Sequence, residues 1–146
     1  SGNGLEVVGL ETLEQQLSFL ENMPVSMQVS LLDQAIAESG KVGEIHEQMV
    51  SAYLENDLVS LRAKSEEQLK VVGESASAYF IESGIHERNH RMAKTLLKQL
   101  ENKTVFVAVG ALHLPGEEGM INILREHGYV LRPLAMPIAG DLVKQP

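Results

Sequence analysis

One histidine, His113, stands where chemistry is most expected in this chain. A run of β-forming residues, 104–109, ends at Gly110, and the imidazole follows three residues later. Open α/β sheets bind their ligands just beyond the carboxyl ends of the strands. A neutral imidazole can act there as a general base or as a metal ligand. Gly110 would let the backbone approach a bound cofactor closely. The alternative is a histidine that only completes a turn.

A second candidate is the segment His86–His90, which matches the pattern H-E-x-x-H. In zincins, two histidines one helical turn apart bind zinc and the glutamate activates water. Here the two residues between Glu87 and His90 are charged Arg88 and polar Asn89, where zincin helices usually carry uncharged and often apolar residues. No glycine and third histidine follow at the extended spacing. A zincin site built from His86, Glu87 and His90 is therefore the less favoured alternative.

The same segment supports a different interpretation. Ile85, Asn89, Met92 and Leu96 fall on one stripe of a helix, so Asn89 is expected among core residues. A buried amide needs hydrogen-bond partners. Together with Arg88, it could bind a carboxylate, a substrate carbonyl or the loop that carries His113. The alternative is a structural tie between this helix and a sheet.

Glu11 is the third candidate, because it stands where a short apolar segment passes into a helical pattern. A carboxylate is favourable near the N-terminus of a helix, which explains the residue without any function. The functional interpretation makes Glu11 a metal or substrate ligand at the carboxyl end of a strand.

The pattern of apolar residues predicts how these candidates are positioned. Helices are expected over residues 11–23, 25–40, about 42–55, 58–69, about 75–100 with a bend near Gly84, and 117–127, and strands over 5–10, 104–109 and 129–134. Asp57 is a suitable N-cap for the fourth helix. The last strand, helix and strand form a βαβ pattern, which implies parallel strands. The predicted fold is therefore α/β and helix-rich, with a small, mostly parallel sheet.

Composition excludes several classes of protein. The 146 residues carry a net charge of −8 and no clear basic patch, which argues against a nucleic-acid surface. The chain has no cysteine, which excludes disulfides and thiol chemistry within it. No apolar run approaches the length of about 18 residues that a membrane span needs. Ser1 and Gly2 resemble a cleaved tag, so residues 1–4 are interpreted as a tag remnant or linker, and 136–146 as a loose tail.

Three strands are few for so many helices, and the last two are apolar enough for the interior of a larger sheet. The chain is therefore expected to be the C-terminal portion, residues 5–135, of a domain. Such a sheet would leave an apolar face and an unpaired edge. We expect a second copy of the chain to cover them, which gives a homo-oligomer.

Three segments in order resemble the TraB/GumN family, which groups with the TIKI proteases and is related to erythromycin esterase-like and ChaN-like proteins. The segments are Val8 to Gln16, Glu87 to Arg91, and Val105 to Gly116 followed by Gly119 and the 125–132 region. The resemblance implies a domain with two Gly-x-x-His motifs, of which Gly110 to His113 is similar to the second. No counterpart of the first is present, so this chain is similar to the C-terminal half of the domain.

The resemblance also implies a function. In TIKI-type members the motifs, with acidic and amide residues, are proposed to form a divalent-metal peptidase site. Carried onto this chain, the catalytic candidates are Glu11, Arg88, Asn89 and His113, with His113 and Glu11 as metal ligands. The expected function is metal-dependent hydrolysis of a peptide or protein substrate, with this chain inactive because one motif is absent. The alternative is a non-catalytic envelope or polysaccharide-associated binding protein, and the family suggests a bacterial envelope or secreted location.

Overall fold

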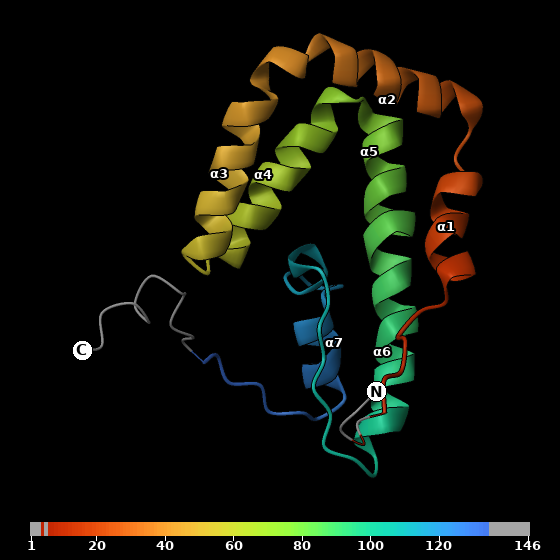
Figure 1. Cartoon of the computed structure of the whole chain (residues 1–146), viewed down its shortest axis with the longest axis vertical. Helices are drawn as coiled ribbons and strands as arrows, with labels where there is room; N and C mark the ends of the chain where they lie inside the picture. The colour runs from red at the N-terminus through yellow and green to blue at the C-terminus, as the bar shows by residue number, and fades with distance from the viewer. Residues whose placement is uncertain (1–3, 5, 135–146) are drawn as a thin grey trace.

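The computed structural model describes residues 4 and 6–134, and this part of the chain consists of helices joined by turns and irregular segments (Figure 1). Most of the expected tag remnant, Leu5 and the expected loose tail lie outside the described residues. The helices are α1 (Leu13–Glu21), α2 (Val25–Ala37), α3 (Val42–Leu54), α4 (Leu58–Val71), α5 (Glu74–Ile81), α6 (Glu87–Leu100) and α7 (Met120–Glu126). Short 3₁₀ turns are η1 (Ser39–Lys41) and η3 (Ala111–His113), and η2 (Glu82–His86) is a π-helical turn.

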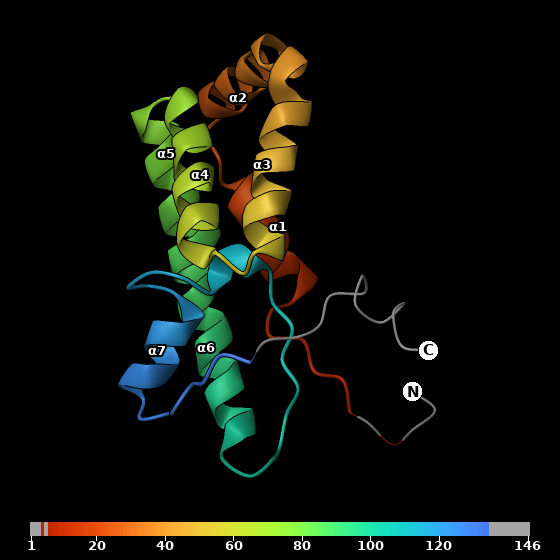
Figure 2. The same cartoon turned by 90° about the vertical axis from the view of Figure 1, so that its left-hand side faces the viewer.

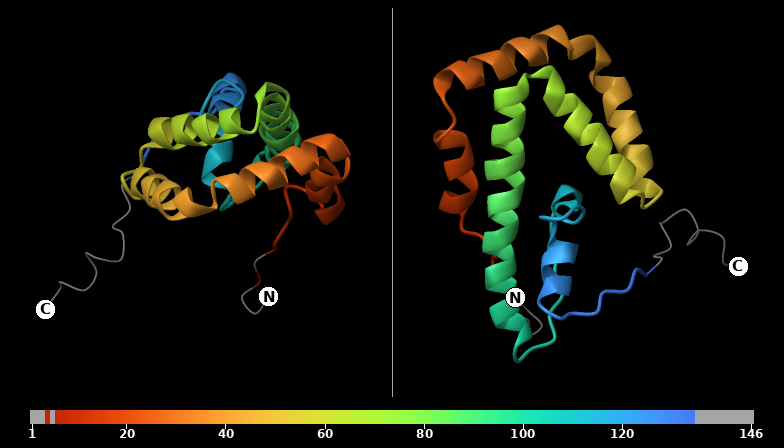
Figure 3. Two further views of the ribbon diagram at one scale, coloured as in Figure 1. Left: turned by 90° about the horizontal axis from the view of Figure 1, so that it is seen from above. Right: turned by 180° about the vertical axis from the view of Figure 1, so that it is seen from behind.

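A single long rod forms the axis of the molecule, in which α5, η2 and α6 follow one another without a break (Figures 1 and 3). This matches the long helix predicted over about 75–100. Near the expected bend, the backbone widens into the π-helical turn instead of breaking. Gly84, in this turn, allows the ring of Phe19 to pack against the helix, because a Cβ atom at position 84 would lie only 3.2 Å from that ring.

The remaining helices pack around the rod. As Figure 1 shows, α1 lies on one side, α2 crosses one end, and α3 pairs with α4 on the other side. Local sequence signals explain where two of these helices begin. Thr12 and Gln15 form a reciprocal capping box at the start of α1. Asp57 accepts a hydrogen bond from the Ser60 amide at the start of α4, as the sequence predicts.

The core lies at the other end of the rod, between α6 and α7. Met92, Ala93 and Leu96 of α6 are buried against Met120 and Ile123 of α7. Figure 2 shows α7 lying beside α6, with η3 next to the point where α4 begins. This arrangement brings the turn that contains His113 against the middle of the rod, where η2 and η3 are in contact.

The prediction of an α/β fold with a small parallel sheet and a C-terminal βαβ unit is wrong. In the described part of the chain, 6–9, 104–109 and 129–134 form neither strands nor helices. A strand exists only when a neighbour pairs with its amide and carbonyl groups, and none of these segments pairs with another in a ladder. The helix between the last two segments does form, as α7, but it connects unpaired segments instead of parallel strands.

One of these segments, 104–109, packs two of its side chains on the core although it lacks the pairing. Val105 and Val109 pack against the α6–α7 core, whereas Phe106 between them is 95% exposed. Several apolar residues of α1 and α2, among them Leu13, Val25 and Ile36, are also exposed. Among the described residues, no helix is both long and apolar enough to cross a membrane.

Candidate functional site

The centre of the candidate site is a hydrogen bond between two buried side chains. The Nδ1 atom of His113 lies 2.7 Å from Oδ1 of Asn89. Asn89 is completely buried and His113 is 9% exposed. Asn89 comes from the first turn of α6, on the inward stripe predicted from the sequence, and His113 ends η3. The two residues are 24 positions apart, and the chain between them includes the irregular segment after α6, so the pair fixes the position of that segment's end.

The surroundings of Asn89 determine which nitrogen of His113 carries the proton. The amide nitrogen of Asn89 donates to the backbone carbonyl of Glu118 at 2.6 Å, and a carbonyl can only accept. The amide oxygen of Asn89 therefore faces His113, and Nδ1 of the imidazole must be the donor. The Nε2 atom of the neutral ring keeps its lone pair, and it has no hydrogen-bond partner among the described residues. Such an outer hydrogen bond to Nδ1 is how proteins orient a histidine that acts as a base or a ligand.

The environment keeps this imidazole neutral. Burial lowers the pKa of His113 below its ordinary value, and the nearby Arg88 guanidinium lowers it further. The carboxylate of Glu11 acts in the opposite direction but does not prevail. The lowered pKa favours the neutral ring, which is the form that can act as a base or a ligand.

Glu11 and Arg88 form a second pair beside the first. The Nε and Nη2 atoms of Arg88 donate to the two carboxylate oxygens of Glu11 at 2.8–3.2 Å, and Nη1 donates to the Gly84 carbonyl at 3.3 Å. Both side chains are largely buried. Because Arg88 precedes Asn89 in α6, the two pairs are adjacent on one helix. The structure thus brings Glu11, Arg88, Asn89 and His113 together, and their catalytic roles stay predictions.

The two outer histidines of the H-E-x-x-H segment contact different carboxylates. His86 lies 3.3 Å from Glu82 within the π-helical turn. His90 lies 2.6 Å from the carboxylate of Glu118, in the turn before α7. Each imidazole thus has its own acidic neighbour, while Arg88 and Asn89 between them face the Glu11 and His113 side chains.

Two glycines near the site differ in whether their positions could accommodate a side chain. Gly110, predicted to bind a cofactor, immediately precedes η3, and its carbonyl accepts a hydrogen bond from the His113 amide at 2.9 Å. Its φ of −59° is open to any residue, so the turn itself does not require glycine there. At Gly119, by contrast, a side chain would overlap the carbonyl oxygens of Leu114 and Pro115. This close approach allows the turn to present the Glu118 carbonyl to Asn89.

Glu118 is a residue whose part in the site the sequence did not reveal. Its position ahead of a helix suggested only a favourable charge at the helix start. In the structure its backbone oxygen fixes the amide of Asn89, and its carboxylate contacts His90. The role of a backbone carbonyl cannot be read from the residue type. The nearest feature in the sequence is Gly119, which the structure shows to be tightly packed.

The described residues do not fit a metal site by themselves. Both carboxylate oxygens of Glu11 already accept hydrogen bonds from Arg88. Within the described part of the chain, no three acidic or imidazole side chains gather closely enough to hold an ion. One free imidazole nitrogen is fewer than the three protein ligands that catalytic zinc sites use. The roles of Glu11 and His113 as metal ligands therefore stay predictions.

Several known proteins are similar in sequence to this chain. The chain is 28% identical to "Metalloprotease TIKI1" of Danio rerio over 153 aligned positions, which cover 88% of this chain and 31% of that protein. It is 26% identical to "Metalloprotease TIKI homolog" of Nematostella vectensis, covering 80% of this chain and 26% of that protein. A shorter match of 63 residues to "Metalloprotease TIKI2" of Xenopus tropicalis is 38% identical and covers 41% of this chain and 12% of that protein.

All three relatives are animal proteins, so they give no support to a bacterial source. The chain spans about a third of the length of the zebrafish relative. No solved structure matches it. The sequence model of the TraB/PrgY/gumN family matches residues 1–133, which include all four candidate site residues. The chain belongs to the TraB/PrgY/gumN family.

Proposed function

We propose that the protein is a peptidase-like hydrolase in which His113 accepts a proton from the attacking water. The observation that carries the proposal is the 2.7 Å hydrogen bond from Nδ1 of His113 to the buried amide of Asn89. It leaves Nε2 unprotonated, while burial and Arg88 lower the pKa of the ring. The proteolytic activity in the names of the TIKI relatives supports the choice of a peptide as the substrate.

The four candidate residues would then have separate roles. Nε2 of His113 takes a proton as water adds to the carbonyl carbon of the peptide bond. The C–N bond breaks, and His113 returns the proton to the leaving amine. Asn89 holds the imidazole in the required tautomer, and the Glu11–Arg88 pair holds the first turn of α6 in place. In this proposal Asn89, Arg88 and Glu11 are positioning residues.

A peptidase assay on the protein expressed from its complete reading frame tests the proposal. We expect turnover of a mixed peptide library to fall by about a hundredfold or more in His113→Ala, because general base catalysis contributes roughly 10²–10⁴-fold. The control is His46→Ala, which removes an exposed imidazole from α3. Chelator treatment in the same assay tests the metal dependence that the relatives' names suggest.

The assay also distinguishes the alternative of a non-catalytic binding protein. One observation favours that alternative: the carboxylate of Glu11 is fully engaged by Arg88, as in a structural ion pair. A protein with no turnover, or with turnover unchanged in His113→Ala, would reject the hydrolase and leave the four residues a structural role.

A further inference from the structure

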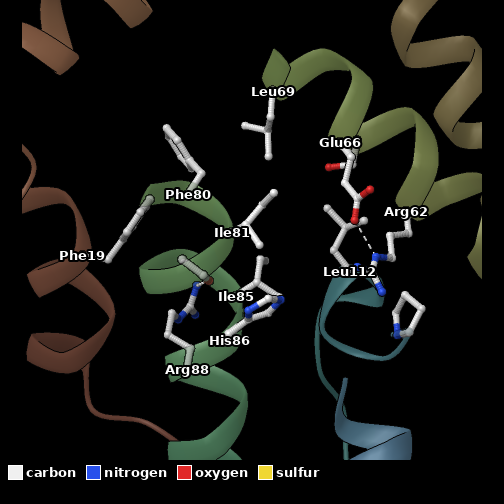
Figure 4. Close-up of a pocket in the computed structure, with 13 residues that line it drawn as sticks. Phe19, Arg62, Glu66, Leu69, Phe80, Ile81, Ile85, His86, Arg88 and Leu112 are labelled. Carbon is white, nitrogen blue, oxygen red and sulfur yellow. Dashed lines mark hydrogen bonds and ion pairs between the residues drawn. The ribbon is translucent and has the colours of Figure 1, made fainter. Parts of the chain in front are cut away.

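A cavity of about 260 Å³ lies between α1, α4, the rod and η3 (Figure 4). Its walls are mainly apolar. Six apolar side chains from four parts of the chain face it: Phe19, Leu69, Phe80, Ile81, Ile85 and Leu112. The two aromatic rings are packed edge to face, with centroids 5.1 Å apart, so this wall is preformed.

The cavity is adjacent to the candidate site through two neighbouring residues. Leu112 lines it, and His113 is the next residue in η3. Arg88 also lines it, and Asn89 is the next residue in α6. A group held in the cavity would therefore lie beside Arg88, one of the four residues of the candidate site.

Arg62 stands where this apolar cavity meets a second, more polar hollow of about 590 Å³, which Glu117, Glu118 and Asn122 help to line. The Nε atom of Arg62 donates to Glu66 at 2.6 Å, which fixes the guanidinium. The guanidinium lies over Gly116, where any side chain would overlap it and where φ is +96°. Its two Nη groups have no hydrogen-bond partner among the described residues.

We infer that the cavity binds one large apolar side chain of a peptide, and that the Nη groups of Arg62 bind the carbonyl or carboxylate oxygen beside that side chain. The inference rests on the proposed function for the choice of a peptide. Mainly apolar walls with a few fixed polar groups, here Arg62 and Glu66 at the mouth and His86 and Arg88 on the rod, are how small-molecule pockets combine affinity with orientation. The expected preference is for residues such as leucine, phenylalanine or methionine next to the cleaved bond.

Binding of a small probe to the full chain tests the inference without any turnover. N-acetyl-L-leucine should shift the methyl NMR signals of Leu69, Ile81, Ile85 and Leu112, and leave those of Val25 and Ile36 on α2 unchanged. N-acetylglycine should bind about tenfold to a hundredfold more weakly, because it buries no apolar side chain. Shifts spread over α2, or equal affinities for the two probes, would overturn the inference.

Two variants locate the binding. Ser65 lines the cavity from α4, so Ser65→Phe should fill it and abolish the leucine-dependent shifts. Ala63→Phe places the same ring on an exposed position of α4 and should leave binding unchanged. Arg62→Gln should weaken the binding of N-acetyl-L-leucine by about two- to fivefold. The effect is modest because the guanidinium is partly exposed. Circular dichroism checks that each variant is folded, and wild-type affinity in folded Ser65→Phe would contradict the inference.

The result of this binding test is independent of the result of the peptidase assay that tests the proposed function. Probe binding in the cavity with no peptide turnover in the complete protein would support the pocket and reject the hydrolase. Turnover that depends on His113 without probe binding, and without preference for large apolar residues, would support the hydrolase and reject the pocket.

Discussion

The first turn of α6 and the segment 104–109 differ in whether their polar groups have hydrogen-bond partners. In α6, Arg88 and Asn89 are paired with Glu11, Gly84, Glu118 and His113, all within the described residues. In 104–109, Val105 and Val109 reach the core, but the backbone groups pair with no neighbouring strand and Phe106 is almost fully exposed. The polar side chains of Arg88 and Asn89 therefore have partners from several parts of the chain, whereas the backbone of 104–109 has no partner strand among the described residues.

The difference shows that the side chains of a site can be held in fixed positions without a β-sheet beside them. One helix and two turns are enough to orient an imidazole, because buried polar groups have few ways to be satisfied. Apolar side chains on an unpaired segment have no such constraint. Paired substitutions in the two regions test this comparison directly.

The largest effect is expected from Arg88→Met. It leaves the largely buried carboxylate of Glu11 without its bidentate partner, and only Arg91, at 3.9 Å, remains nearby. We expect the free energy of unfolding to fall by about 3 kcal/mol in urea titrations, the range for breaking a buried pair from one side. Arg132→Met, in the exposed segment 129–134, should change it by less than about 0.5 kcal/mol. Equal effects of the two substitutions would remove the distinction between the regions.

Asn89→Leu should have the next largest effect. The substitution leaves Nδ1–H of His113 and the carbonyl of Glu118 unpaired in the interior. We expect a loss of about 2 kcal/mol, from the desolvation of these groups. Asn102→Leu, at an exposed turn, serves as the matched control and should be close to neutral. A variant as stable as the parent would mean that the Asn89 network does not fix the turn.

The effect of pH should be smaller and have a defined sign. The pKa of His113 is lowered in the folded protein, so between that pKa and the ordinary value of 6.5 the unfolded chain binds more protons. Stability is therefore fully present above about pH 6.5 and decreases as the pH falls through that window. Urea titrations at pH 7.5 and 5.5 measure the change, which should be reduced in His113→Gln. A pH dependence identical in the two proteins would place the cause at other histidines.

Phe106→Lys should have the smallest effect on folding. The ring is 95% exposed, so the free energy of unfolding should change by less than about 0.5 kcal/mol. If a second copy covers this surface, as we expect, sedimentation velocity should show concentration-dependent association of the parent chain and less association of the variant. Thr104→Lys adds the same charge on the same segment without removing apolar surface. A parent chain that stays monomeric at high concentration would contradict this expectation.

The sequence predicted features whose partners are close along the chain. The cap at Asp57 and the inward position of Asn89 follow from spacings of three or four residues, whereas the cap at Thr12 was not predicted, because that helix was expected from residue 11. The sheet was predicted wrongly because β-formers in 104–109 and 129–134 indicate a tendency, whereas a strand also needs a partner. The Glu118 carbonyl and the fit of Arg62 over Gly116 could not be predicted, since both join backbone to a side chain from a distant helix.

The π-helical turn at Glu82–His86 has a consequence for how this site tolerates change in length. One extra residue in a helical turn rotates everything after it by about 100° relative to an uninterrupted α-helix. Phe80 before the turn contacts Phe19, and Asn89 after it bonds His113, so the turn sets the angle between these two contacts of the rod. Deleting a single residue from this turn would swing Asn89 away from the imidazole even if every side chain were retained. The position of the amide thus depends on the number of residues between Phe80 and Asn89 as much as on their identity.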